Sequence, residues 1–266
     1  MHKVYTLGPQ FSYSYNLAAR VFDPQNIVCV HNISDVFDQV MAQDSARGIV
    51  PIENMLTGSV RESLLSLKKY NICIERSFDL RIEHVLASQT DTYTKIASYT
   101  QPLAQCSAFV RSKKCAVVEA SSTSAAMQIA AEDPSVAAIG NEEAAHHYGV
   151  PVVERQISDR MRNITRFIEI RNNKKTCTIT GSKTSMIITP TEDRAGLLFE
   201  ILSVFEIKGI NLTKIESMPT GNKMNDYIFY IEIDGALEER RIQDALAFLR
   251  TFVTVDVFGS YNIEEV

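Results

Sequence analysis

The chain has 266 residues, of which 45% are hydrophobic, and its 27 basic and 32 acidic side chains give a formal net charge of −5. This size and apolar content allow one large or two modest globular domains, each with its own core. Because the basic residues form no stripe that neutralises phosphates, nucleic acid is excluded as an expected partner.

The first residues and the cysteines bear on the compartment of the protein. No apolar run approaches the roughly 20 residues of a membrane span, and the start has no stretch of signal length, so we expect no membrane partner and a cytoplasmic location. The five cysteines are odd in number and lack C-x-x-C spacing. We therefore expect mostly small core residues, without a full disulfide framework or a thiolate metal site, at Cys29, Cys73, Cys106, Cys115 and Cys177.

The first 170 residues alternate short β-rich apolar runs with helical patterns, which predicts an α/β fold. The strand-like runs are 3–7, 48–52, 80–87, 116–119 and 136–139. The helical patterns include 63–67 and 124–131, the second preceded by Ser121, Ser122 and Thr123 as candidate N-caps. Ligands of open α/β sheets bind where strands end and helices begin, so we expect the site in those loops.

A polar stretch at 171–175, followed by Gly181-Ser182-Lys183, predicts an interdomain connection. We place the boundary near residue 180, which gives domains of residues 1–178 and 179–266. The second domain has the predicted order strand, helix, strand, strand, helix, strand, a βαββαβ unit. Its elements are expected at 184–189, 196–208, 210–218, 227–233, 238–251 and 253–258, with a turn at Gly221-Asn222.

Seven short motifs resemble, in order and spacing, those of the prephenate dehydratase family, whose members convert prephenate to phenylpyruvate on the route to phenylalanine. They are Leu7-Gly8-Pro9 with Ser12-Tyr13-Ser14, Val50-Pro51-Ile52-Glu53-Asn54 with Gly58-Ser59-Val60, Gln101 with Leu103-Ala104-Gln105-Cys106, Glu119 with Ser122-Thr123-Ser124-Ala125-Ala126, Asn163-Ile164-Thr165-Arg166-Phe167, Gly196-Leu197-Leu198, and Ile210 to Ser217. The last two resemble the family's ACT domain, a small amino-acid-binding module. The resemblance implies a bilobed catalytic domain of the type-2 periplasmic-binding-protein kind, a ferredoxin-like ACT domain, and a homodimer or homotetramer.

The resemblance also implies roles for site residues. Thr165 occupies the position that assists departure of the hydroxyl group, Arg166 offers a guanidinium fork for a carboxylate, and Phe167 packs against the ring. Uncharged donors for the substrate hydroxyl and carboxylates are expected at Ser14, Asn54, Gln101, Ser122, Thr123 and Asn163. Such a scheme needs no cofactor and no metal. His146 and His147 are adjacent in a helical pattern and cannot chelate together, whereas His84 remains open between a structural and a cleft role.

The C-terminal domain is expected to bind free phenylalanine at a subunit interface, which would favour a less active state by differential affinity. The expected effector residues are Gly196, Leu197, Leu198, Glu216 and Ser217. A passive dimerisation domain is the alternative reading. Met218 stands where the family's Glu-Ser-Arg-Pro motif, which is linked to phenylalanine binding, has arginine.

Other departures from the family pattern fall near the expected cleft. Met55 stands where serine is usual, Tyr99 and Thr100 replace a His-Pro pair, and Phe11 replaces a glycine, the residue that most readily takes positive φ. Two alternative functions therefore stay open, a non-catalytic sensor of small anions or amino acids and a prephenate decarboxylase. Thr165 argues against the decarboxylase, in which that threonine is expected to be missing. We expect a monofunctional enzyme, without a chorismate mutase bundle before residue 1.

Overall fold

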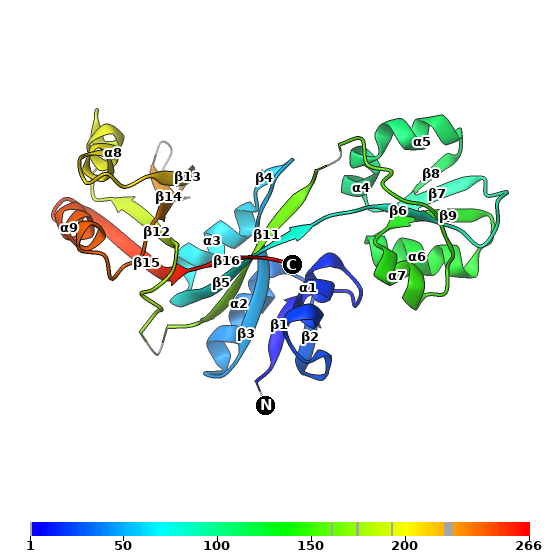
Figure 1. Cartoon of the computed structure of the whole chain (residues 1–266), viewed down its shortest axis with the longest axis horizontal. Coiled ribbons are helices and arrows are strands. Elements are labelled where there is room, and N and C mark those ends of the chain that lie inside the picture. The colour runs from blue at the N-terminus through cyan, green and yellow to red at the C-terminus, as the bar shows by residue number, and fades with distance from the viewer. Residues whose placement is uncertain (1, 161, 174–175, 193, 221–225) are drawn as a thin grey trace.

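The computed structural model describes residues 2–160, 162–173, 176–192, 194–220 and 226–266, and the described strands form three sheets. The sheets lie in a row along the long axis of the molecule (Figure 1). The middle sheet and the sheet at one end belong to the two lobes of the N-terminal part, and the sheet at the other end belongs to the C-terminal domain. The bilobed α/β architecture expected from the sequence is confirmed.

Lobe 1 is built on the middle sheet, in the order β16-β5-β11-β3-β1-β2. Its strands are β1 (Val4–Leu7), β2 (Ile27–Val30), β3 (Arg47–Asn54), β4 (Gly58–Ser59), β5 (Ile72–Arg81), β11 (Ile164–Asn172) and β16 (Ile263–Glu265). Its helices are α1 (Tyr13–Val21), η1 (Pro24–Asn26), α2 (Ile33–Ala42) and α3 (Arg61–Lys69). The apolar side chains of α1 form one buried cluster with the sheet, and those of α2 and α3 form another. The sheet is therefore buried on both faces.

Lobe 2 is built on the sheet ordered β10-β6-β9-β7-β8. Its strands are β6 (Val85–Ala87), β7 (Lys95–Ser98), β8 (Ala116–Glu119), β9 (Val136–Gly140) and β10 (Val152–Glu154). Its helices are α4 (Thr100–Gln105), α5 (Ser107–Lys113), α6 (Thr123–Glu132) and α7 (Glu142–His147). Because β7, β8 and β9 are parallel and each is followed by a helix start, their carboxyl ends form one edge of the lobe.

The C-terminal domain has the predicted βαββαβ order, with sheet order β13-β14-β12-β15. Its elements are β12 (Lys183–Pro190), α8 (Leu197–Ile207), β13 (Leu212–Pro219), β14 (Tyr227–Asp234), α9 (Arg240–Leu249) and β15 (Val253–Tyr261). One face of this sheet packs on α8 and α9, and the other shares a buried apolar cluster with lobe 1. The turn expected at Gly221-Asn222 lies outside the described residues.

The structure differs from two sequence predictions in lobe 1 and its connections. The run 80–87 is not one strand, because β5 ends at Arg81 and β6 starts at Val85, where the chain crosses between lobes. The polar stretch 171–175 is not wholly a connector, since β11 continues through Asn172 and Arg171 is buried. After β15 the chain returns to lobe 1, where β16 pairs in parallel with β5. The boundary between 178 and 179 remains our prediction, with β16 reaching back across it.

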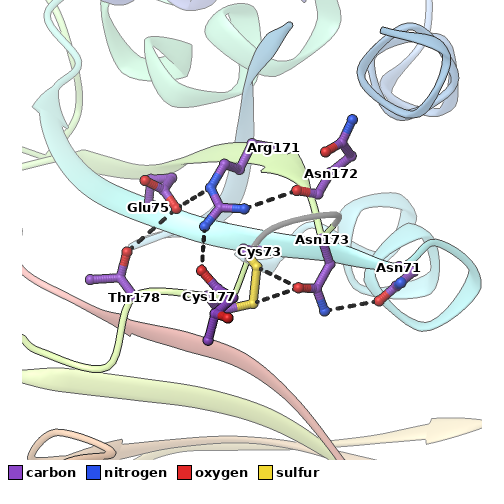
Figure 2. Close-up of a disulfide and its surroundings, with 9 residues drawn as sticks. Asn71, Cys73, Glu75, Arg171, Asn172, Asn173, Cys177 and Thr178 are labelled. Atoms are coloured by element: carbon purple, nitrogen blue, oxygen red, sulfur yellow. Dashed lines mark hydrogen bonds and ion pairs between the residues drawn. A yellow bond between two sulfur atoms is a disulfide. The ribbon is translucent and has the colours of Figure 1, made fainter. Parts of the chain in front are cut away.

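The expectation for the cysteines was wrong for one pair. Cys73 on β5 and Cys177 on the connector to β12 form a disulfide across 104 positions of sequence, as Figure 2 shows. Around it, Arg171 pairs with Glu75 and donates to the carbonyl of Thr176, which holds the connector against β5. The sequence could not reveal this pairing because the two cysteines meet only when β5 and β11 lie side by side. The other cysteines are free, with Cys106 buried and Cys29 and Cys115 half-buried.

Among the described residues, none of the helices is both long and apolar enough to cross a lipid bilayer.

Candidate active site

Three of the predicted site residues meet where the chain passes between the lobes. Asn54 ends β3, Thr165 lies opposite it on β11, and Asn163 comes just before β11. The side-chain nitrogen of Asn54 donates to Thr165 Oγ1 at 2.9 Å and to Asn163 Oδ1 at 2.8 Å. Asn54 and Asn163 are both buried, so these bonds are protected from water. Residues distant in sequence thus form one connected group.

The orientation of the Asn54 amide follows from its backbone surroundings. Asn54 Oδ1 accepts hydrogen bonds from the backbone N–H groups of Leu56 at 3.1 Å and Thr57 at 3.2 Å. Two donors at this atom require it to be the oxygen, so the amide nitrogen must point toward Thr165. The Thr165 oxygen accepts from Asn54, and its own proton remains available for a second partner. Thr165 is therefore set up as a hydrogen-bond donor.

The hydrogen bonds continue from Asn163 into lobe 2 and back to α1. Asn163 Nδ2 donates to Gln105 Oε1 at 3.2 Å, and His84 Nε2 lies 2.8 Å from the same oxygen. His84 Nδ1 lies 2.9 Å from the Tyr13 hydroxyl, which donates to the carbonyl oxygen of Glu83 at 2.6 Å. We call Tyr13, Asn54, His84, Gln105, Asn163 and Thr165 the hinge network. It connects both lobes at the point where the chain passes from one to the other.

Gln105 and His84 add features that the sequence argument did not assign. Gln105 Nε2 is buried and has no hydrogen-bond partner among the described residues, although Gln105 Oε1 has two neighbours. A buried donor without a partner is costly, so its presence beside Thr165's network points to a ligand or water acceptor. Gln105 belongs to the same motif as Gln101, and only the structure shows that the later glutamine reaches the hinge.

Burial lowers the pKa of His84 below its ordinary value of 6.5, and the hydrogen bond with Gln105 opposes this effect. The folded state therefore favours neutral His84, whereas the unfolded state binds a proton as the pH falls through 6.5. Above pH 6.5 the ionisation of His84 does not change the free energy of unfolding. Below pH 6.5 the free energy of unfolding falls by up to about 1.4 kcal/mol per pH unit, until the folded His84 also protonates.

We expect His84→Gln to remove this part of the acid sensitivity. Urea unfolding at pH 7.5, 6 and 5 should show a smaller loss of unfolding free energy for the variant than for the original chain. His146→Gln is the matched control, because His146 is exposed near the end of α7. Equal pH slopes for the original chain and His84→Gln would show that His84 is not held neutral.

The predicted donors of lobe 2 lie at the edge formed by the carboxyl ends of β7 and β8. Gln101 lies in the first turn of α4 and is exposed. Ser122 caps α6, with Oγ accepting from the backbone N–H of Ala125 at 3.0 Å, and Thr123 is the buried first residue of that helix. Ser14, in lobe 1, is buried in the first turn of α1. The structure thus places these four residues near helix starts, and among the described residues none of the four forms a hydrogen bond with Thr165.

The loop between β1 and α1 joins the two lobes on the α1 side. The carbonyl oxygen of Gln10 accepts from Ser124 at 2.9 Å, and that of Phe11 accepts from Asn141 at 2.8 Å. Phe11, which stands in place of the family's usual glycine, has φ of 63°, a left-handed conformation that is unfavourable for a residue with a side chain. Its ring stacks on His147 at 3.7 Å between centroids.

A hollow of 860 Å³ lies between α1, the hinge and α7. Tyr13 from the hinge network lines it, together with acidic and basic side chains that include Arg20, Arg81, Glu83 and Glu143. Arg20 and Glu143 form an ion pair across it at 2.8 Å. Thr165 and Asn54 do not line this hollow, so its size does not identify the position of the reacting groups. The hydrogen bonds around Thr165 identify the candidate active site instead.

The two residues after Thr165 lie elsewhere than the sequence argument placed them. Phe167 is 2% exposed and packs with Phe78, Leu80 and Leu17 in the core under α1, where it cannot lie against a substrate ring. Arg166 binds Asp79 through two nitrogens, Nε at 2.7 Å and Nη2 at 2.9 Å. Its fork is already occupied, which argues against a role as carboxylate anchor.

The predicted effector residues divide into two places within one chain. Gly196, Leu197 and Leu198 line a hollow of 200 Å³ beside Tyr227 and Phe229. Glu216 and Ser217 lie instead on β13, where Glu216 accepts from the Ser59 hydroxyl at 3.1 Å. Met218, which replaces the family's arginine, is buried in the cluster shared with lobe 1.

The fold and the hinge network define the class of this protein, a bilobed α/β domain with polar groups between its lobes, followed by an ACT-type domain. The model of the family described as prephenate dehydratase matches residues 4–175, and that of the ACT domain matches residues 186–251. The chain belongs to the prephenate dehydratase family.

Individual relatives agree with this assignment. The chain is 34% identical to the bifunctional chorismate mutase/prephenate dehydratase of Aquifex aeolicus, over 97% of this chain and 73% of that protein. It is 32% identical to the prephenate dehydratase of Methanocaldococcus jannaschii, over 98% and 97%. The solved structure of Arthrobacter aurescens prephenate dehydratase in complex with L-Phe is 29% identical, with a TM-score of 0.87 over 98% of this chain and 90% of that one.

Proposed function

We propose that this chain is a prephenate dehydratase, a carbon–oxygen lyase that converts prephenate to phenylpyruvate. The observation that carries the proposal is the Thr165 hydroxyl, which accepts from Asn54 and so keeps its proton for the leaving group. Family membership and the relatives' names support the substrate. Neutral donors around Thr165 suit a dianionic substrate because they stabilise its oxygens without adding a competing base.

In this reaction the bond from the ring to its carboxylate breaks and its electron pair moves into the ring. The C4–O bond breaks at the other end of the ring, and the departing hydroxyl takes a proton. Carbon dioxide and water leave, and the ring becomes aromatic, which supplies much of the driving force. We assign Thr165 as the donor at the departing oxygen, Asn54 as the group that orients it, and Gln105 Nε2 as a donor to the substrate.

Regulation by L-phenylalanine is part of the proposal, because a relative of similar fold is described in complex with L-Phe. The effector would bind at a subunit interface, between Gly196 to Leu198 of one protomer and Glu216-Ser217 of another in a homodimer or homotetramer. Exposed apolar side chains on α8, Phe199 and Ile207, support an oligomer. We propose a cytoplasmic location, because a dianionic substrate crosses a bilayer only at high cost.

The test is to incubate the purified protein with prephenate near neutral pH and to follow phenylpyruvate by its alkaline absorbance against an uncatalysed blank. Product above the blank, lowered by added L-phenylalanine, is the expected result. A product that loses carbon dioxide but keeps the hydroxyl would support a decarboxylase instead. Prephenate binding without any product would support the non-catalytic sensor.

Asn54→Asp tests the orientation of the network with almost no change of shape. The carboxylate can still accept from the N–H groups of Leu56 and Thr57, so the turn after β3 should persist. It cannot donate to Thr165, whose hydroxyl would turn toward the new carboxylate. We expect kcat to fall about 100-fold in initial-rate assays. Unchanged kcat would contradict the assignment of Asn54 as the orienting donor, and circular dichroism should show an intact fold.

A further inference from the structure

Arg166 and Thr165 lie on opposite faces of β11. Successive side chains of a strand point to opposite faces, and the register irregularity of β11 comes only after Arg166. In the register of the sheet, Arg166 lies between Glu53 on β3 and Asp79 on β5. Glu53 forms an ion pair with Lys214 of the ACT domain at 2.9 Å. The face of the sheet that carries Glu53, Arg166 and Asp79 is therefore the one toward the ACT domain.

The guanidinium group of Arg166 is held by two carboxylates. Two of its nitrogens, Nε and Nη2, donate hydrogen bonds to the carboxylate of Asp79. The third nitrogen, Nη1, lies 3.7 Å from Oε1 of Glu232 on β14. The hydrogen bonds with Asp79 raise the pKa of Arg166 further above its ordinary value, so the group is charged at any working pH. The guanidinium group of Arg166 is therefore held rigidly, because its two parallel hydrogen bonds match the geometry of the Asp79 carboxylate.

Glu232 is fixed by the ACT domain. It is 3% exposed and accepts from the Thr213 hydroxyl at 2.6 Å and the Tyr261 hydroxyl at 3.1 Å, with Lys183 Nζ at 3.8 Å. A buried carboxylate with several partners has few alternative positions. Any displacement of β14 therefore changes the distance between Glu232 and Arg166.

We propose that Arg166 is a positioning residue that transmits the position of β14, through Glu232, to the adjacent Thr165, so that the ACT domain controls dehydratase turnover. This inference rests on the proposed dehydratase function. It replaces the sequence expectation that Arg166 anchors a substrate carboxylate.

The predicted effector residues have a direct connection to this link. Lys214 and Glu216 lie two residues apart on β13 and so point to the same face of the sheet. Because β13 pairs with β14, Lys214 lies opposite Glu232 and Glu216 opposite Tyr230. Glu216 also accepts from Ser59 on β4, which pairs with Glu53. An effector that binds Glu216 and Ser217 would displace β13 and β14 together, and this displacement would reach both β11 and the hairpin that follows Asn54.

Glu232→Gln tests the link, because glutamine keeps the size, its single side-chain oxygen can still accept from Thr213, and its amide nitrogen can donate to the Tyr261 hydroxyl oxygen instead of accepting from it. We expect kcat without effector to fall about tenfold while KM stays within about twofold, since a small misplacement of a catalytic group affects the chemical step. The L-phenylalanine concentration for half-inhibition should rise at least about fivefold. Asp256→Asn is the matched control, since it removes another ion pair between the ACT domain and lobe 1, to Lys68 of α3 at 2.8 Å, which involves neither β11 nor β14.

The inference is overturned if Glu232→Gln and Asp256→Asn give the same kinetics. If Glu232→Gln does not fold by circular dichroism, Arg166→Lys decides: a fall in kcat at constant KM supports positioning, whereas a raised KM at constant kcat means that Arg166 binds substrate. Absence of turnover in the original chain refutes the proposed function, and the inference falls with it.

Discussion

Thr165→Val is expected to lower kcat for prephenate by about 10²- to 10⁴-fold, the usual contribution of a positioned proton donor. Valine has nearly the shape of threonine and suits a strand, so β11 should remain intact. The loss is confined to the hydroxyl that accepts from Asn54 and is left free to donate. Prephenate binding, measured by calorimetry, should change little, because this donor acts mainly on the departing oxygen.

Thr165→Ser is the matched control, since it keeps the hydroxyl and loses only a methyl group. It should retain most of the turnover. If Thr165→Val turned over prephenate at the rate of the original chain, the donor would have to be another group, and Gln105 with its unpartnered nitrogen would be the next candidate.

Removal of the Cys73–Cys177 disulfide is expected to lower the free energy of unfolding by about 4 kcal/mol, because the bond closes a long loop in the unfolded chain. Cys73→Ser with Cys177→Ser, compared with the original chain in urea under non-reducing conditions, measures this difference. Arg171, Glu75 and Thr178 should still hold the connector in the folded state, so turnover should be less affected than stability.

Two controls accompany that measurement. Cys115→Ser removes a free, half-buried thiol and should leave the unfolding free energy nearly unchanged. Thiol titration of the unfolded protein should find Cys29, Cys106 and Cys115 before reduction, and all five cysteines after it. Five reactive thiols before reduction would mean that the disulfide is absent. In the folded protein Cys106 should react slowest, since burial raises its pKa to about 12 and keeps it protonated.

Local patterns predicted the elements of the C-terminal domain well. Periodic apolar residues and turn residues are properties of short segments, so the helix expected at 196–208 is α8 at Leu197–Ile207 and the strand expected at 227–233 is β14 at Tyr227–Asp234. The same reasoning joined 80–87 into one strand, because Leu80 and Ile82 alternate with polar residues as in a half-buried strand and lead directly into the apolar segment that starts at Val85. The short strand β16 had no local signal, since its pairing with β5 depends on how the domains pack.

The candidate site was predicted in part. The motifs brought Asn54, Asn163 and Thr165 to attention, and the structure joins them by hydrogen bonds. Their roles remain proposals that turnover measurements decide. For Arg166 and Phe167, the guanidinium fork and the aromatic ring suggested contact with the substrate, yet alternation along β11 turns Arg166 toward the ACT domain and the core encloses Phe167.

By itself, the sequence determined the fold class, the ACT-type domain and the family motifs, because periodicity and short motifs are carried by neighbouring residues. Only the tertiary structure decided which side chains meet: the Asn54–Thr165 bond, the link from Gln105 to His84, the disulfide, and the contact of Arg166 with Glu232. Each joins residues on separate elements, and its geometry depends on strand register and domain packing, which no local pattern encodes.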